Sequence, residues 1–278
     1  MSALVTGGAG AMGRAAAASL ARDGASVVLM GRTEASLAQA AEEVATQGRF
    51  GAEVALIVGD AARGEDVQNA VARAGAMRNC RFAMCVATPG GGRKAPLMLL
   101  DKQALMDAFE LNLITAFHAV KYSAAVMGAA EGGSIVCVSS IAARLSWPYL
   151  ASYSVSKAGL EALVRVAADE LGHLGIRVNA IRPGLSRNAN NGAQFEGDAH
   201  RRAVSQMPLG RSGVPQDIAA GIRYLAGPES SWVTGQSLAI DGGQELRRAS
   251  DYEPDTRRIW GDDAVDAAQS GIIPASLE

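Results

Sequence analysis

A tyrosine and a lysine four residues apart, Tyr153 and Lys157 in the segment YSVSK, are the side chains best suited to acid–base chemistry. On a helix this spacing places both side chains on one face, one turn apart. An ammonium beside a phenol favours the tyrosinate, which brings the pKa of the phenol toward neutral pH and makes it usable as a general acid or base. The pattern is common by itself, so its meaning depends on the elements that position it.

Two short polar segments follow apolar runs on either side of this pair. Ser139 and Ser140 come directly after the run 134–138, and Ser140 precedes the tyrosine by thirteen residues. Pro183 and Gly184 come after the next apolar run. Open parallel sheets bind ligands outside the carboxyl ends of their strands. We therefore expect these residues to gather at one edge of a sheet.

A glycine turn follows the first apolar run of the chain. The segment TGGAGAMG contains GxGxxG at Gly8, Gly10 and Gly13, and an alanine-rich helical pattern follows it. Glycines permit the tight turn and the close approach of a pyrophosphate, and the helix N-terminus offers free N–H groups to the phosphate oxygens. The motif predicts a dinucleotide site; the alternative is a turn that only packs the helix against the strand.

The end of the second apolar run bears on the choice between NAD and NADP. An acid there binds the ribose 2′-hydroxyl, whereas an arginine accommodates a 2′-phosphate. Arg32 stands 19 residues beyond Gly13, where the acid would lie, so NADP is favoured and NAD is the alternative. Glu34 is the competing acid. Asp60, after the third apolar run, is placed to bind an adenine edge or to cap a helix.

Short apolar runs alternate with longer helical patterns along the chain, which is typical of a parallel sheet with helical crossovers. The predicted strands cover residues 3–5, 26–30, 53–58, 82–86, 134–138, 177–181 and 237–240. The predicted helices cover residues 12–22, 34–46, 64–74, 102–127, 153–171 and 215–226. Right-handed crossovers then give a single-domain α/β fold, a Rossmann-type doubly wound sheet of about seven parallel strands flanked by helices.

Composition excludes several classes of protein. Twenty-six basic and 28 acidic residues give a net charge of −2, without the basic excess that a nucleic acid demands. No apolar run reaches the length that spans a bilayer, and the first residues lack the features of a signal peptide. The three cysteines form no CxxC pair and the three histidines lack metal-ligand spacing. We expect a cytoplasmic protein with no nucleic acid, membrane or metal as a partner.

Residues 244–278 differ from residues 1–243, because 12 of these 35 residues are charged. Their stretches 259–260 and 271–274 are nevertheless too apolar for a purely solvated tail. We expect residues 1–243 to form the Rossmann-fold domain and residues 244–278 to be an extension docked on the body or on a neighbouring subunit. A disordered end is the alternative.

Several segments together resemble the short-chain dehydrogenase/reductase family over roughly residues 2–243. They are TGGAGAMG, GSIVCVSS, YSVSK, RVNAIRPG and the late stretch from PLGRSG to AIDGG. The resemblance implies NADP(H)-dependent hydride transfer between nicotinamide and a ketone or secondary alcohol. Tyr153 would be the general acid/base, Ser140 would hold the substrate oxygen, and Lys157 would bind the nicotinamide ribose and lower the pKa of Tyr153. Asn112 would position the water of a proton relay.

The same resemblance implies the cofactor contacts and shows three departures. The implied contacts are Gly7, Gly8, Gly10, Met12, Gly13, Arg32, Thr33, Asp60, Ala61, Ala87, Tyr153, Lys157, Pro183, Gly184 and Asn188. Ala11 replaces the middle glycine of the usual turn, and CVATPGGG stands where the family shows NNAG. Its three glycines indicate a mobile or closely packed edge of the site. Asn188 stands where a threonine commonly binds the carboxamide.

The substrate side and the assembly also follow from the resemblance. Residues 185–209 fall where the family carries its substrate lid. We expect Leu145 and Trp147, with Ser140 and Tyr153, to line an apolar pocket for a hydrophobic or cyclic carbonyl or alcohol, although Trp147 could pack away from it. A homotetramer, with a dimer as the alternative, would pack through the helices 102–127 and 153–171 and the final strand.

Other functions stay open at this point. They are a 3-oxoacyl thioester reductase, an NAD-dependent alcohol dehydrogenase and a catalytically silent nucleotide-sensing binding protein. A thioester reductase would want a basic patch for an acidic carrier, for which Arg201, Arg202 and Arg211 are the candidates. The silent protein is disfavoured because the set of four predicted catalytic residues is intact.

Overall fold

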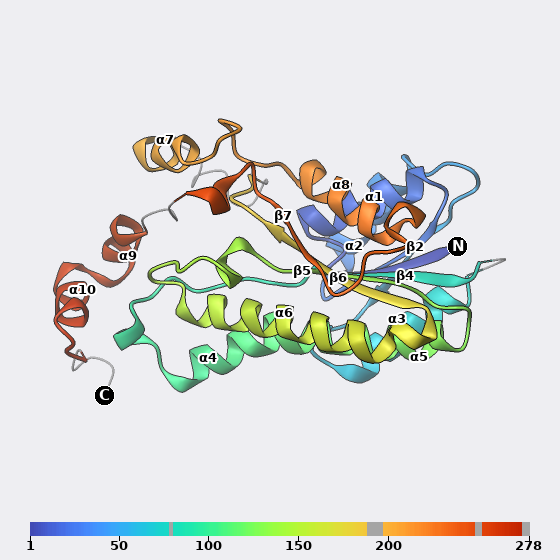
Figure 1. The fold of residues 1–278 in the computed structure, drawn as a ribbon, viewed down its shortest axis with the longest axis horizontal. Coiled ribbons are helices and arrows are strands. Elements are labelled where there is room, and N and C mark those ends of the chain that lie inside the picture. Colours follow the sequence, from blue (N-terminus) through green and yellow to red (C-terminus); the bar gives the residue numbers. More distant parts are fainter. Residues whose placement is uncertain (78–79, 188–196, 248–251, 274–278) are drawn as a thin grey trace.

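Seven parallel strands form one sheet in the order β3-β2-β1-β4-β5-β6-β7 (Figure 1). The computed structural model describes residues 1–77, 80–187, 197–247 and 252–273. The strands are β1 (Ser2–Thr6), β2 (Ser26–Gly31), β3 (Val54–Val58), β4 (Phe82–Ala87), β5 (Gly133–Val138), β6 (Ile176–Pro183) and β7 (Ser237–Ile240). The predicted doubly wound fold of about seven parallel strands is confirmed.

The strand register brings the predicted polar segments to one edge. Thr6 at the end of β1 pairs with Met30 of β2 and with Ala87 of β4. Ala87 in turn pairs with Cys137 of β5, and Val138 pairs with Ile181 of β6. The glycine turn, the Ser139–Ser140 segment and the Pro183–Gly184 segment therefore leave the sheet side by side.

Two layers of helices cover the sheet because the central strands are buried on both faces. Leu20, Leu37 and Ile218 pack on one face, and Val67, Val120 and Leu160 on the other. The first layer is α1 (Ala11–Arg22), α2 (Glu34–Ala45) and α8 (Pro215–Ala226); the second is α3 (Gly64–Gly75), α5 (Thr115–Gly128) and α6 (Ala151–Leu171). Within the described parts of the chain, no helix is long and apolar enough to cross a bilayer.

The predicted helix 102–127 is wrong in one respect, because it is interrupted. It comprises α4 (Lys102–Phe109), a π-helical turn (Glu110–Ile114) and α5. The turn contains Asn112, whose Nδ2 donates to the carbonyl oxygen of Ala108 at 2.8 Å. An amide that bonds the backbone one turn earlier competes with the regular helical ladder, and such π-turns are frequent at functional sites.

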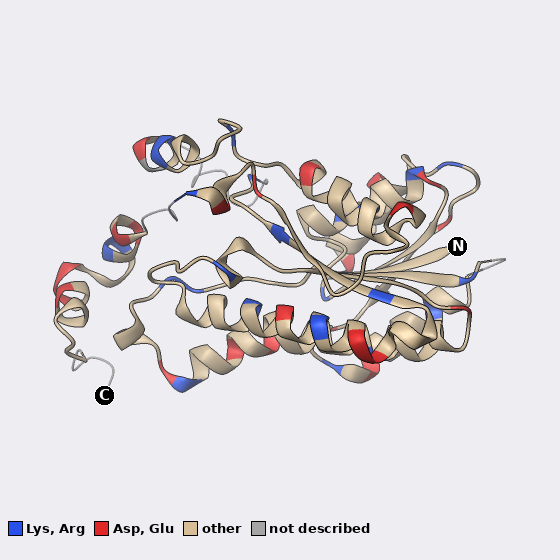
Figure 2. Ribbon diagram, viewed as in Figure 1, with Lys and Arg blue, Asp and Glu red and all other residues tan. Residues whose placement is uncertain are grey.

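The remaining helices lie around the carboxyl edge of the sheet or in short connections. They are α7 (Gly197–Ser205), α9 (Glu253–Trp260) and α10 (Asp262–Gln269), with 3₁₀ turns at Leu97–Leu99, Ile141–Ala143, Gly172–Leu174, Pro228–Ser230 and Gln244–Leu246. Helices α9 and α10 lie at the end of the molecule where α6 begins (Figure 1). Helix α9 carries charges of both signs and α10 only acidic ones, whereas most of the sheet carries no charge (Figure 2).

Candidate active site

Helix α6 begins two residues before Tyr153 and holds both Tyr153 and Lys157 at the carboxyl end of β5. The Lys157 side chain is almost completely buried, and its Nζ donates to the carbonyl oxygen of Val138 at 2.7 Å. Its ammonium nitrogen lies 5.9 Å from the centre of the Tyr153 ring. The two side chains therefore share one wall, as the four-residue spacing predicts.

Burial sets the protonation of both groups. Removal from water lowers the pKa of Lys157 to about 8, because the charged form loses its hydration. Burial also raises the pKa of Tyr153, and a hydrogen bond with Ser140 opposes this only in part. The predicted lowering of the Tyr153 pKa is therefore not seen in this structure, because burial moves this pKa in the opposite direction. At neutral pH the phenol carries its proton.

Ser140 lies beside this phenol at the start of a 3₁₀ turn. Its hydroxyl oxygen accepts a hydrogen bond from the backbone nitrogen of Ala142 at 3.1 Å, which begins the turn Ile141–Ala143. The same side chain is hydrogen-bonded to Tyr153. The structural role as a turn cap and the contact with the phenol thus coexist, and two hydroxyl groups converge where a substrate oxygen could bind.

Asn112 is fully buried and is bonded to the glycine loop that follows β4. Its Oδ1 accepts from the backbone nitrogen of Gly91 at 3.1 Å, and its Nδ2 donates to the Gly91 oxygen at 2.9 Å. A Cβ atom on Gly90 would lie 2.8 Å from Nζ of Lys157 and 3.1 Å from Oδ1 of Asn112. The loop is the closely packed edge that the three glycines indicate.

Gly92 provides a sharp test of this packing. A Cβ atom there would meet Cβ of Tyr153 at 2.6 Å, which forces the Tyr153 side chain or the loop to move. We expect Gly92→Ala to lower kcat by about tenfold or more, since small misplacements at a reacting centre are costly. Gly91→Ala is the matched control, because its Cβ meets only the end of Leu111 at 3.3 Å. Steady-state kinetics measure kcat for both variants. Equal kcat values for Gly92→Ala and Gly91→Ala would contradict the packing argument.

The glycine turn forms a backbone cradle at the start of α1. Gly7 has φ +70°, and a Cβ on Gly13 would lie 2.5 Å from the Gly7 oxygen, so the turn closes only without side chains. Gly10 caps α1 with no side-chain hydrogen bond and no acid in the first turn. Gly8 is buried against Leu29, and Met12 is partly buried on α1. The free N–H groups suit a pyrophosphate.

The residues predicted around the adenosine end lie at neighbouring strand ends. Arg32 and Thr33 are exposed after β2, and no hydrogen bond to Arg32 is seen among the described residues. Oδ1 of Asp60 accepts from the backbone nitrogen of Ala62 at 2.9 Å, so an adenine contact would rest on its second oxygen. Ala61 is buried, and its carbonyl oxygen lies 3.2 Å from Nδ1 of His118.

Three more predicted cofactor contacts come from β4 and β6. Ala87 is buried at the end of β4, and Pro183 ends β6. A Cβ on Gly184 would lie 2.8 Å from Cα of Asp241, so only glycine allows this approach. Asn188 lies outside the described residues, as does the lid segment 188–196.

The two predicted substrate residues join a small apolar cluster with Tyr153. Trp147 is 7% exposed and packs with Ile141, Ala142 and Leu150; Leu145 and Tyr153 are partly buried against this cluster. The Trp147 ring is stacked on the Tyr252 ring, with 5.6 Å between the ring centres and an interplanar angle of 5°. Tyr252, which was not predicted as a site residue, therefore belongs to this wall; only the apolar content of its segment hinted at docking.

A buried polar network behind the serines was also not predicted. Oε1 of Glu161 accepts from the hydroxyls of Ser139 at 2.9 Å and Ser237 at 2.8 Å. Arg182 lies 3.8 Å from Glu161 and pairs with Glu245 at 2.6 Å. Glu161 follows Lys157 by one helical turn, and this spacing was the sequence feature that could have predicted its place near the site. The network ties β5, β6 and β7 to α6 at the site.

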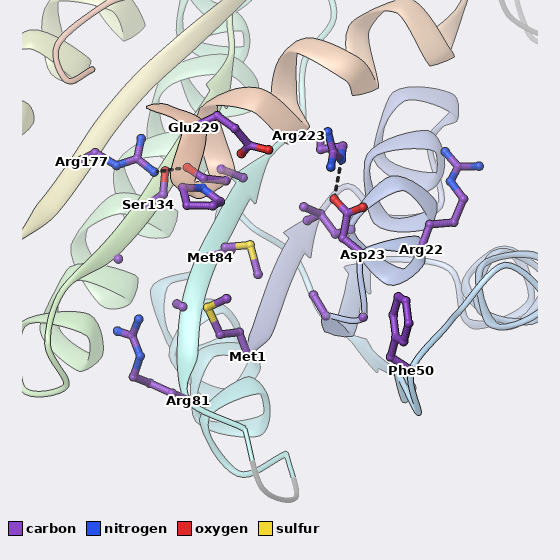
Figure 3. Close-up of a pocket in the computed structure, with 18 of the residues that line it drawn as sticks. Met1, Arg22, Asp23, Phe50, Arg81, Met84, Ser134, Arg177, Arg223 and Glu229 are labelled. Carbon is purple, nitrogen blue, oxygen red and sulfur yellow. Dashed lines mark hydrogen bonds and ion pairs between the residues drawn. The ribbon is translucent and has the colours of Figure 1, made fainter. Parts of the chain in front are cut away.

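A broad hollow of about 800 Å³ lies at the opposite, amino-terminal edge of the sheet (Figure 3). Met1 and Met84 lie between its charged walls, where Arg223 pairs with Asp23 and Arg177 donates to Ser230. Four of its five arginines, Arg22, Arg81, Arg177 and Arg223, donate to backbone or side-chain acceptors, and Tyr153 and Lys157 do not line it. The hollow is therefore separate from the candidate active site at the carboxyl edge.

Comparison with known proteins shows the family of this chain. Residues 7–245 match a family described as enoyl-(acyl carrier protein) reductase, and the match spans the glycine turn, Tyr153 and Lys157. The chain belongs to the short-chain dehydrogenase/reductase family. Members of this family act on alcohol and ketone groups with a nicotinamide cofactor.

Three similar proteins illustrate the range of the family. The chain is 36% identical to an A-factor type gamma-butyrolactone 1′-reductase of Streptomyces virginiae, over 87% of this chain and 94% of that protein. It is 35% identical to a cis-4-hydroxycyclohexanecarboxylate dehydrogenase of Sinomonas cyclohexanicum, over 87% and 95%. A short-chain dehydrogenase/reductase structure from Mycobacterium ulcerans has a TM-score of 0.90 at 34% identity, covering 95% of this chain and 97% of that one.

Proposed function

We propose that this chain is an NADP(H)-dependent oxidoreductase that interconverts a ketone and a secondary alcohol, with Tyr153 as the general acid/base. One observation carries the proposal: a protonated phenol, hydrogen-bonded to Ser140, shares a buried wall with the Lys157 ammonium. A phenol placed beside a second hydroxyl group can donate its proton to a ketone oxygen in reduction, and its phenolate can accept the proton of an alcohol in oxidation.

The chain's own residues divide the work of the reaction. When bound, the cofactor supplies the hydride. Ser140 and Tyr153 hold the carbonyl oxygen between two hydroxyl groups, and the phenol O–H gives its proton to that oxygen as the alcohol forms. The Lys157 ammonium stabilises the tyrosinate that results. Asn112 holds the loop at Gly91 against α4, which keeps Lys157 and Tyr153 in register with the strand ends.

The backbone cradle at Gly7 to Gly13 fits a dinucleotide, and Arg32 supports NADP as the preferred form. Its guanidinium is exposed beyond β2, where a 2′-phosphate would lie. We expect Arg32→Asp to shift the ratio of kcat/KM for NADPH over NADH toward NADH by about a hundredfold, because an attraction for the phosphate becomes a repulsion. Arg63→Asp, at an exposed arginine outside the proposed cofactor contacts, is the control. An unchanged ratio would remove Arg32 from the assignment.

The substrate proposed is a small hydrophobic or cyclic ketone. The cluster of Ile141, Leu145, Trp147 and Leu150 next to Tyr153 is apolar, and one relative is named for a cyclohexane ring. The test is a titration with NADPH and NADH, followed by a panel of cyclic, aromatic and acyl-thioester ketones. Oxidation of NADPH by a cyclic ketone is expected; cofactor binding without turnover of any member would favour a nucleotide-sensing protein.

A 3-oxoacyl thioester reductase is the second candidate, since the matching family is described by an acyl-carrier substrate. It would need basic side chains available to an acidic carrier. Arg201 pairs with Asp198, and Arg211 pairs with Asp217 at 2.7 Å, so two of the three candidate arginines are already neutralised. The thioesters in the panel separate the two functions.

The proposed assembly is a homotetramer, with a dimer as the alternative. Apolar side chains are exposed along the π-turn and helices α4, α5 and α6, and the Trp232 side chain is 99% exposed beside β7. They include Leu105, Met106, Ile114, Phe117, Val155 and Val166. Patches of this kind mark contact surfaces between proteins. A cytoplasmic location fits the three free cysteines, which a reducing compartment preserves.

A further inference from the structure

The segment 252–269, named here the cap, lies against the candidate active site although the family match ends at residue 245. The two relatives named above cover 87% of this chain, whereas the Mycobacterium ulcerans structure covers 95%. The cap is formed by Tyr252, α9 and α10. Any role it has in the reaction is therefore specific to part of the family.

The cap is anchored on residues 93 and 94, next to the glycine loop. Nζ of Lys94 lies 2.9 Å from Oδ2 of Asp255. The backbone oxygen of Lys94 accepts a hydrogen bond from Nε1 of Trp260 at 3.0 Å. The Arg93 guanidinium lies 4.7 Å from the centre of the Trp260 ring. The preceding residue is Gly92, which packs on Tyr153. The anchor at Arg93 therefore directly follows Gly92, the glycine that packs against Tyr153.

A second anchor joins the cap to the loop that carries Trp147. The Tyr149 hydroxyl bonds Glu253 at 3.3 Å and accepts from Nε2 of Gln269 at 3.1 Å. Arg257 links Glu253 at 2.9 Å to Asp266 at 2.8 Å within the cap. Both helices of the cap are therefore tied to the substrate side of the fold.

Tyr252 is the cap residue that contacts the apolar cluster beside Tyr153. Its ring stacks on Trp147, the Lys94 ammonium lies 4.0 Å from its centre, and it packs on the same cluster as Tyr153. A ring held by a parallel indole and a cation has a fixed orientation. The Lys94 charge is neutralised by Asp255, so this side of the site suits an uncharged group.

We propose that Tyr252 is a specificity-determining residue that closes the apolar side of the substrate site and restricts it to compact, uncharged, single-ring ketones. The inference rests on the proposed ketone reductase function, because it concerns the same site. Tyr252 takes no part in proton transfer in this proposal. Its ring, stacked on Trp147, bounds the apolar side of the space beside Tyr153, so fused-ring ketones are expected to react more slowly than single-ring ones.

The test compares Tyr252→Ala with Tyr252→Phe, which keeps the ring, and with Ile259→Ala at an exposed position of α9. Tyr252→Leu serves as a second variant that retains apolar packing if the alanine variant unfolds. The preference for the compact ketone is the ratio of the rate with cyclohexanone, which has one ring, to the rate with 1-decalone, which has two fused rings. We expect that preference to fall about tenfold or more in the alanine variant, as steric selection in apolar pockets reaches such values. The phenylalanine and Ile259 variants should stay within about twofold.

A binding measurement separates failure of this inference from failure of the proposed function. Calorimetric titration of each ketone into the complex with oxidised cofactor needs no turnover. If ketones bind the wild type without reacting, the ratio of the two Kd values in Tyr252→Ala still decides the role of Tyr252. An unchanged ratio, a change shared by Ile259→Ala, or no ketone binding by the wild type would overturn the proposal.

Discussion

Tyr153→Phe is expected to lower kcat by about a thousandfold while leaving the affinity for NADPH within about twofold. The substitution removes only the phenol oxygen, and proton transfer by a positioned side chain typically contributes 10²–10⁴-fold. The ring keeps its packing against the cluster of Trp147 and Leu150, so the fold and the cofactor site are preserved. Stopped-flow rates and fluorescence titration of the cofactor measure the two quantities.

Tyr224→Phe is the matched control for this variant, because Tyr224 lies on α8 and its side chain is partly exposed. Its kcat should equal that of the wild type. Substantial turnover by Tyr153→Phe, above about a tenth of the wild-type rate, would refute the acid/base role and move the proton donor to another group.

Lys157→Met is expected to abolish most activity and, at the same time, to change how stability depends on pH. The buried ammonium lies 5.9 Å from the centre of the Tyr153 ring, and the methionine side chain carries no charge to replace it. Its pKa is about 8 in the folded protein against 10.5 for an ordinary lysine. The unfolded chain therefore binds more protons between these two values, and the free energy of unfolding rises with pH across that window.

The magnitude follows from the same two values. A difference of 2.5 pKa units at about 1.36 kcal/mol per unit corresponds to about 3 kcal/mol. This stabilisation is present above pH 10.5 and is lost as the pH falls through about 8. In Lys157→Met the contribution is absent, so the difference in unfolding free energy between wild type and variant should grow by about 3 kcal/mol from pH 8 to 10.5.

Denaturant unfolding at several pH values measures this difference and cancels the titration of buried groups that do not interact with Lys157, such as Cys85, whose pKa burial raises. Lys121→Met, at an exposed lysine of α5, should show no such dependence. A difference between wild type and Lys157→Met that is flat with pH would mean that the lysine is solvated in solution, and the argument from its burial would not hold.

The sheet and its two helical layers could be predicted because they depend on local patterns. Each central strand is a short apolar run, and each crossover helix has an apolar face that one sheet covers. The glycine turn and the Tyr153–Lys157 spacing are equally local, since both lie within a single loop or helical turn. Parallel pairing then forces the carboxyl ends of the strands, and with them the site, to one edge.

The sequence by itself thus determined the fold class and the edge of the sheet at which Tyr153, Lys157 and the glycine turn lie. The tertiary structure alone decided three other features. Burial set the direction of the Tyr153 pKa, and the bonds of Asn112 to Gly91 accompany a π-turn where an uninterrupted helix was predicted. Contacts across more than 150 residues, such as Trp260 to Lys94, brought Tyr252 to the substrate wall. Solvent exclusion and long-range docking depend on the assembled chain, which no local pattern encodes.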